Sequence, residues 1–186
     1  NLTIVASGRW LGLEVDRANP CLRGARCDLM DEHYYETPDT MAQMGHLYDA
    51  PAYNRSSMPR VFVGEFAANK PWPGAQTLRA ALAEGILQLG FERNADVVIA
   101  SAFAPLLNNV HGTQWAYNLI NFNATSSYVL PSYHAQRLLS RSLGSHTLDA
   151  ALSDHGSSRA GGAWIAAASA LGEPGNAPGA ARGHSP

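Results

Sequence analysis

The chain has 186 residues, of which 46% are hydrophobic and 15% charged, and a formal net charge of -2 at pH 7. This composition fits a globular domain with an ordinary hydrophobic core. The 13 Lys and Arg residues are scattered, so the basic stripe of a nucleic-acid partner is missing. No apolar run approaches the roughly 20 residues of a membrane span, so we expect no membrane partner either.

Four segments of the chain are predicted to be buried β-strands. Each is short, rich in Val, Ile or aromatic residues, and bounded by polar residues, Pro or Gly. In chain order they are LTIVAS (2–7), CDLMDEHYY (27–35), RVFVGEFA (60–67) and ADVVIASAF (95–103).

Helical patterns lie between and after these strands. The first begins after Thr37, the expected N-cap, with Pro38 in the first helical position and Met41, Met44 and Leu47 as apolar residues. The second follows Pro73-Gly74 and carries an apolar stripe of Leu78, Leu82, Ile86 and Leu89, with Arg79 and Glu84 expected to point away. The third begins at Pro131 and is expected to end at Gly144.

Strands that alternate with helices predict βα units around a parallel α/β sheet. Four such units are too few to close an eight-stranded barrel. Residues 145–171 differ, because HTLDAALSD (146–154) and AWIAAASA (163–170) resemble two β segments around a Gly/Ser linker. Residues 172–186 are mostly Gly, Pro and Ala, and we expect a disordered tail there.

Polar side chains stand at the carboxyl ends of two predicted strands. Reactive groups of parallel βα folds gather at this edge of the sheet. Glu65 ends the third strand, and His33 and Tyr35 end the second, where their spacing of two residues puts them on the same side as Asp31. A carboxylate beside an imidazole and a phenol is what a glycosidase needs: a nucleophile and donors that orient it.

Several blocks of the sequence carry a family resemblance. The chain resembles the α-L-arabinofuranosidases of glycoside hydrolase family 51 over about residues 1–144, more weakly to about residue 170, and the blocks occur in the family's order. They are DEHYYETP (31–38), YDAPAYNR (48–55), PRVFVGEFA (59–67), TLRAALAEGILQLGFERNADVVIASAFAPLL (77–107), HGTQWAYNLINFN (111–123) and PSYHAQRLLS (131–140).

The resemblance implies a fold and a reaction. Residues 1–144 would be the C-terminal half of a (β/α)8 TIM barrel, about four βα units, and residues 145–171 the start of a β-sandwich domain. The family hydrolyses with retention, through a covalent arabinosyl-enzyme. Glu65 corresponds to its nucleophile, and His33 and Tyr35 to the His and Tyr that line its sugar site.

The resemblance also places the WxxN segment near the substrate. Trp115 could stack on a sugar ring and Asn118 could bind a hydroxyl, and the alternative is that Trp115 packs its own loop. The family's acid/base Glu follows an Asn, and no Asn-Glu pair occurs in this sequence. A fragment that lacks this residue is therefore expected to be inactive alone.

Two other functions stay open: a fragment of another TIM-barrel glycosidase, such as a xylanase or glucanase, and a non-catalytic carbohydrate-binding remnant. The expected partner is an arabinose-containing polysaccharide or oligosaccharide, such as arabinan or arabinoxylan. Open outer strands of half a barrel also predict self-association.

We expect no metal or other cofactor, because His33, His46, His111 and His134 lie on different elements without the close spacing of zinc ligands. Spacing does not decide whether Cys21 and Cys27 are bonded. Three Asn-x-Ser/Thr sequences, at Asn1, Asn54 and Asn123, hint at secretion, and an extracellular or periplasmic place is favoured for the full-length protein.

Overall fold

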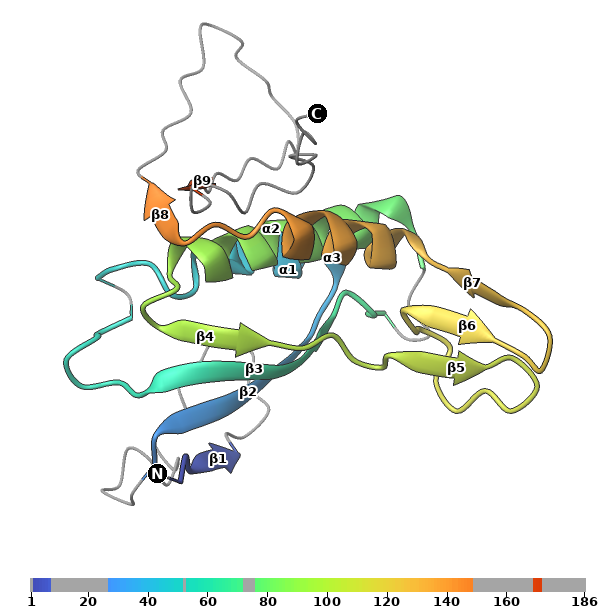
Figure 1. The fold of residues 1–186 in the computed structure, drawn as a ribbon, viewed down its shortest axis with the longest axis horizontal. Coiled ribbons are helices and arrows are strands. Elements are labelled where there is room, and N and C mark those ends of the chain that lie inside the picture. The colour runs from blue at the N-terminus through green and yellow to red at the C-terminus, as the bar shows by residue number, and fades with distance from the viewer. Residues whose placement is uncertain (1, 8–26, 52, 72–75, 149–168, 172–186) are drawn as a thin grey trace, which may run out of the picture.

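The fold is a mixed α/β architecture built on a parallel sheet (Figure 1). The computed structural model describes residues 2–7, 27–51, 53–71, 76–148 and 169–171. Four parallel strands lie in the order β1-β2-β3-β4, as the alternation of strands and helices predicts. They are β1 (Val5–Ser7), β2 (Leu29–Tyr35), β3 (Arg60–Ala67) and β4 (Val98–Ser101), so the two outer strands are shorter than expected.

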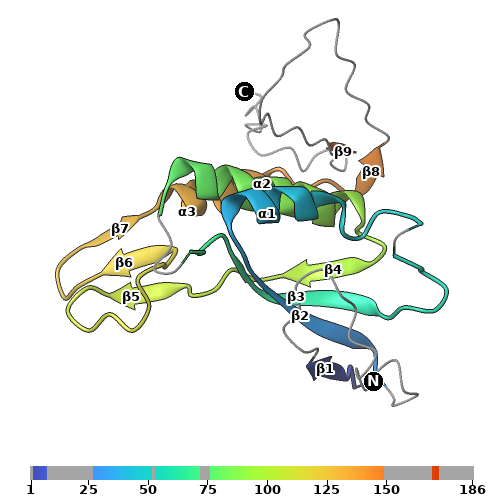
Figure 2. The same cartoon turned by 180° about the vertical axis from the view of Figure 1, so that it is seen from behind.

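The helices lie on one side of this sheet, as the front and back views agree (Figures 1 and 2). They are α1 (Pro38–Gln43), the 3-10 helix η2 (Met44–His46), α2 (Leu78–Arg93) and α3 (Pro131–Arg141). The Thr37 hydroxyl caps α1 by accepting from the backbone N–H of Thr40 at 3.2 Å, as predicted. The third helix ends at Arg141, three residues before the expected stop, with Ser142 as its C-cap.

The predicted apolar stripe of α2 is wrong. Leu78 and Leu82 are 65% and 56% exposed, and the side chain of Glu84, expected to point to solvent, is completely buried. The face of α2 that is buried is instead made of small residues together with Leu87 and Phe91; the small ones are Ala80, Ala81, Ala83 and Gly90. Small side chains let neighbouring backbones approach closely, which leaves the larger leucines outside.

An aromatic cluster fills the space between the sheet and the helices. The ring of Phe66, on β3, meets Phe91 of α2 at a centroid distance of 5.8 Å and Phe103, after β4, at 5.6 Å. Phe103 in turn stacks on Tyr117 at 6.2 Å. Edge-to-face and stacked aromatic pairs add to the stability that burial provides. The cluster therefore fixes the C-terminal end of β3 against α2.

Two further small sheets follow β4. The first was not predicted: β5 (Leu107–Asn109), β6 (Ile120–Phe122) and β7 (Ser127–Val129) form a three-stranded sheet beyond the C-terminal end of β4 (Figure 1). The second pairs β8 (His146–Leu148) with β9 (Ser169–Leu171) in antiparallel fashion, inside the region expected to be β. The expected tail, 172–186, lies outside the described residues.

A network of charged groups joins the segment after η2 to the end of α2. Asp49 accepts hydrogen bonds from Arg93 Nε at 3.0 Å, from Asn94 Nδ2 at 2.8 Å, and pairs with His46 Nδ1 at 2.8 Å. Burial alone would raise the pKa of Asp49, but the hydrogen bonds from Arg93, Asn94 and His46 outweigh it and lower the pKa to about 2. The carboxylate is thus a structural tie at this end of the helix.

Within the part of the chain that the structure describes, no helix combines the length and the apolar character needed to cross a membrane.

Candidate active site

A one-residue irregularity in β3 decides which way Glu65 points. Glu32 of β2 pairs with Val63, but the next residue, His33, pairs with Glu65, so Gly64 has no partner across the strands. An extra residue of this kind reverses the alternation of side chains that follow it. Because of this bulge, Glu65 faces the same side of the sheet as His33, instead of the opposite side.

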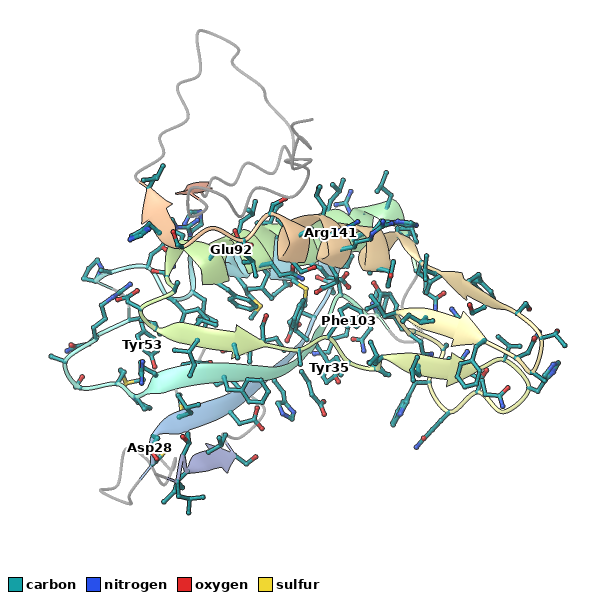
Figure 3. All side chains as sticks on the ribbon, viewed as in Figure 1. Asp28, Tyr35, Tyr53, Glu92, Phe103 and Arg141 are labelled. Atoms are coloured by element: carbon teal, nitrogen blue, oxygen red, sulfur yellow. The ribbon has the colours of Figure 1, made fainter. Side chains whose placement is uncertain are left out.

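The bulge brings three of the predicted site residues together. The Tyr35 hydroxyl donates a hydrogen bond of 2.6 Å to Glu65 Oε2, and His33 Nδ1 lies 3.4 Å from the same oxygen. This is the contact expected from their strand positions. Tyr35 marks the place in Figure 3, where β2 and β3 end. The Glu65 side chain keeps 41% of its surface exposed, so the carboxylate is open to a ligand.

Tyr35 acts as a donor in this group. Burial raises the pKa of Tyr35 most, and the hydrogen bond to Glu65 and the charge of Glu65 raise it further. The phenol therefore stays protonated at neutral pH and donates to Oε2. Among the described residues, the hydrogen bond and the ion pair of Glu65 both use Oε2, and neither uses Oε1.

A second carboxylate stands behind His33. Asp31 Oδ2 lies 3.1 Å from His33 Nε2, so the imidazole ring sits between two carboxylates. Asp31 precedes His33 by two residues on β2, which puts both on the same side, as the sequence predicts. The sequence gives no direct signal for this contact beyond that spacing.

The other side of β2 is occupied by a separate buried cluster. The hydroxyls of Tyr34 and Tyr48 both donate to Glu32 Oε2, the latter at 2.5 Å. Burial raises the pKa of Glu32 although these hydrogen bonds lower it. Glu32 therefore belongs to the interface with the helices and takes no part in the site around Glu65.

Glu84 is the buried residue that the sequence analysis misplaced. Its Oε1 accepts from the backbone N–H of Ala68 at 2.9 Å and from the Tyr117 hydroxyl at 2.7 Å. The Tyr117 hydroxyl is also 3.0 Å from Ser132 Oγ of α3. Burial raises the pKa of Glu84 more than these hydrogen bonds lower it. Glu84 thereby links the end of β3 to the loop before β6.

That loop carries the other two predicted site residues. Trp115 is 49% exposed, whereas Asn118 is only 2% exposed and donates through Nδ2 to the carbonyl of Trp115. The buried amide of Asn118 thus shapes the loop in this structure, and only the Trp115 ring is open to solvent. The hydrogen bond of Asn118 thus stays within its own loop and does not reach Glu65.

Among the described residues, no three His, Cys, Asp or Glu side chains gather in a way that could hold a metal ion. Cys27 is disulfide-bonded, and Cys21 lies outside the described residues.

The fold and these side chains define a class: a mixed α/β protein with a carboxylate-centred polar site at the carboxyl ends of parallel strands. Residues 60–171 match the family model of the α-L-arabinofuranosidase C-terminal domain. The chain therefore belongs to the α-L-arabinofuranosidase family.

Curated relatives agree with this assignment. The chain is 35% identical over 133 residues to an extracellular exo-α-L-arabinofuranosidase of Streptomyces chartreusis, which covers 72% of this chain and 15% of that protein. It is 32% identical over 131 residues to α-L-arabinofuranosidase 1 of Arabidopsis thaliana, covering 70% and 19%. The chain thus spans less than a fifth of the length of these relatives.

A solved structure is similar as well. An arabinose-bound α-L-arabinofuranosidase of glycoside hydrolase family 51 matches with a TM-score of 0.67 and 28% sequence identity, over 80% of this chain and 24% of that chain.

Proposed function

We propose that the chain is part of a retaining α-L-arabinofuranosidase, in which residues 1–144 form the C-terminal half of a (β/α)8 barrel. Residues 145–171 then begin a β-sandwich, and 172–186 form a tail. The four-stranded parallel sheet with its helices on one side supports the half barrel. We refer below to the protein whose barrel this chain helps to form as the whole enzyme.

The observation that carries the proposal is the hydrogen bond between Tyr35 and Glu65 at the strand ends. Glu65 is the nucleophile. Its Oε2 is held by Tyr35 and His33, so Oε1 attacks the anomeric carbon of the sugar. A bond forms between Oε1 and that carbon, the glycosidic C–O bond breaks, and an arabinosyl ester of Glu65 results.

The leaving oxygen needs a proton, and a second carboxyl group supplies it. In retaining glycosidases this acid/base group lies about 5 to 5.5 Å from the nucleophile. We propose that it comes from a part of the barrel outside these 186 residues, because the sequence holds no Asn-Glu pair. The same group then removes a proton from the water that hydrolyses the ester.

The substrate that this site fits is a non-reducing-end α-L-arabinofuranosyl residue of an arabinan or arabinoxylan type of chain. The similarity to an arabinose-bound structure supports this class of ligand. The exposed ring of Trp115 would stack on a sugar, and buried Asn118 would hold the loop that presents it.

The test uses the whole enzyme with 4-nitrophenyl α-L-arabinofuranoside, and NMR to follow the configuration of the first-formed product. We expect retention of configuration, and a loss of activity of several orders of magnitude in Glu65→Gln. The matched control is Glu92→Gln, since Glu92 is a half-buried residue near the end of α2, away from the strand ends. Inversion, or an active Glu65→Gln variant, would refute the proposal. Faster hydrolysis of a β-xyloside would instead favour a xylanase.

A further inference from the structure

The imidazole of His33 has a carboxylate on each side. Nε2 lies 3.1 Å from Asp31 Oδ2, and Nδ1 lies 3.4 Å from Glu65 Oε2. An ionised carboxylate can only accept hydrogen bonds, and a neutral imidazole has a single N–H. The ring can therefore satisfy both neighbours only when each nitrogen carries a proton.

The Asp31 carboxylate occupies the space beside Gly64 of the neighbouring strand, which has no side chain. A Cβ atom added at Gly64 would lie 2.1 Å from Asp31 Oδ1 and 3.1 Å from Asp31 Cγ. The backbone of Gly64 is not in the left-handed region, so another residue could adopt it. An added side chain would therefore displace the Asp31 carboxylate, and it would also lie 3.3 Å from His33 Nε2.

Burial of the Asp31 carboxylate at this place is unfavourable, which argues that the carboxylate has a function there. Asp31 Oδ1 is buried and has no hydrogen-bond partner among the described residues. A buried acceptor without a partner loses its hydration and gains nothing in return. An apolar residue beside Gly64 would avoid this loss, but it could not accept a hydrogen bond from His33.

We propose that Asp31 is a positioning residue of the active site, which acts through His33. This inference rests on the proposed role of Glu65 as the nucleophile. Asp31, beside Gly64, bonds to Nε2 and fixes the orientation of the imidazole. The ring is then held with Nδ1 3.4 Å from Glu65 Oε2. Together with the hydroxyl of Tyr35, the imidazole holds Oε2 in place and leaves Oε1 to attack.

The first experiment records the ring nitrogens of His33 by ¹⁵N NMR in the 186-residue chain, with the signals assigned by a His33→Gln variant. We expect the ¹⁵N shifts of the ring nitrogens to change in Asp31→Asn, because Nε2 then loses the carboxylate to which it is bonded. The matched control is Asp39→Asn, because Asp39 lies on the exposed surface of α1. Identical His33 spectra in the native chain and in Asp31→Asn would overturn the proposal.

A second variant keeps the test decisive if Asp31→Asn does not fold. Gly64→Ala keeps the aspartate in the chain but fills the space that its carboxylate occupies. It should therefore change the His33 spectrum in the same direction. If the space beside Gly64 serves to hold Asp31, Gly64→Ala should destabilise the native chain. The same substitution should be nearly neutral when it is combined with Asp31→Ala. An equal loss of stability in both backgrounds would contradict this part of the argument.

Kinetics of the whole enzyme separate this proposal from the proposed function. We expect Asp31→Asn to lower kcat by about 10- to 100-fold, the loss that follows when the partner orienting a metal-bound His is removed, with a smaller change in KM. If Glu65→Gln is inactive while Asp31→Asn keeps full kcat, the positioning role fails and the nucleophile stands. If Glu65→Gln is active, the proposed function itself fails.

Discussion

Two glycines of α2 should respond in opposite ways to the same substitution. A Cβ atom at Gly85 would meet nothing within 4 Å, whereas one at Gly90 would lie 2.3 Å from the carbonyl oxygen of Gly45 and 3.2 Å from its Cα. The Gly45 oxygen is held in place, since Arg93 Nη2 donates to it at 2.6 Å. The two sites therefore compare an open and a closed position on one helix.

The magnitudes follow from two terms. Alanine is favoured over glycine inside a helix by roughly 1 kcal/mol, and this gain applies at both positions. At Gly90 the overlap is with backbone atoms, so overpacking costs about 1 to 3 kcal/mol, at the upper end because the backbone must move. Gly85→Ala should thus stabilise the chain by about 1 kcal/mol, and Gly90→Ala should destabilise it by about 2 kcal/mol.

Urea unfolding followed by circular dichroism measures the change in the free energy of unfolding for each variant, and thermal unfolding gives the melting temperatures. For a chain of this size the melting temperature changes by about 2 to 4 °C per kcal/mol, so the two variants should melt about 6 °C or more apart. Shifts of both variants in the same direction would refute the view that α2 and η2 pack through their glycines.

Three further predictions concern charge and association. Asp49→Asn should destabilise the chain by about 2 kcal/mol at neutral pH. Because the folded pKa of Asp49 is lowered to about 2, the stability difference between the two chains should be full above the ordinary pKa of 3.8 and vanish as the pH falls through 2. A stability difference that does not depend on pH would disprove the ion pair with Arg93. Glu84 has a raised pKa, so its burial destabilises the chain increasingly as the pH rises above the ordinary value of 4.5, and Glu84→Gln should remove that slope in unfolding measurements. Glu84→Leu should cost about 1 to 3 kcal/mol, because the backbone N–H of Ala68 loses its acceptor. The outer strands of the sheet carry Val5 and Ile99, exposed by 48% and 42%, so sedimentation should show association that grows with concentration, and a monodisperse monomer at all concentrations would contradict it.

Much of the fold follows from simple patterns. The alternation of apolar strands with helices predicted the parallel order of β1 to β4, because such units have few other arrangements. The side of β2 shared by Asp31, His33 and Tyr35 followed from a spacing of two residues. In each case the prediction needed only local periodicity.

Other features depend on contacts between distant residues. The bulge at Gly64 turns Glu65 toward His33. A glycine inside a strand such as RVFVGEFA can mark a bulge, a bend or a close approach of another backbone, and the sequence alone does not distinguish them. The face of α2 was misjudged because leucines are the stronger apolar signal, yet close backbone packing selected alanines and Gly90. The run of alanines was the signal that could have shown which face of α2 is buried, and that Glu84 lies on it.

The central claim is that Glu65 attacks the sugar, and trapping the covalent intermediate tests it most directly. The whole enzyme would be mixed with an α-L-arabinofuranosyl donor that has a good leaving group, quenched with acid, digested and analysed by mass spectrometry. The account predicts an arabinosyl ester on the peptide that contains Glu65, absent in Glu65→Gln. An ester on a different carboxylate, while the product retains its configuration, would contradict the account.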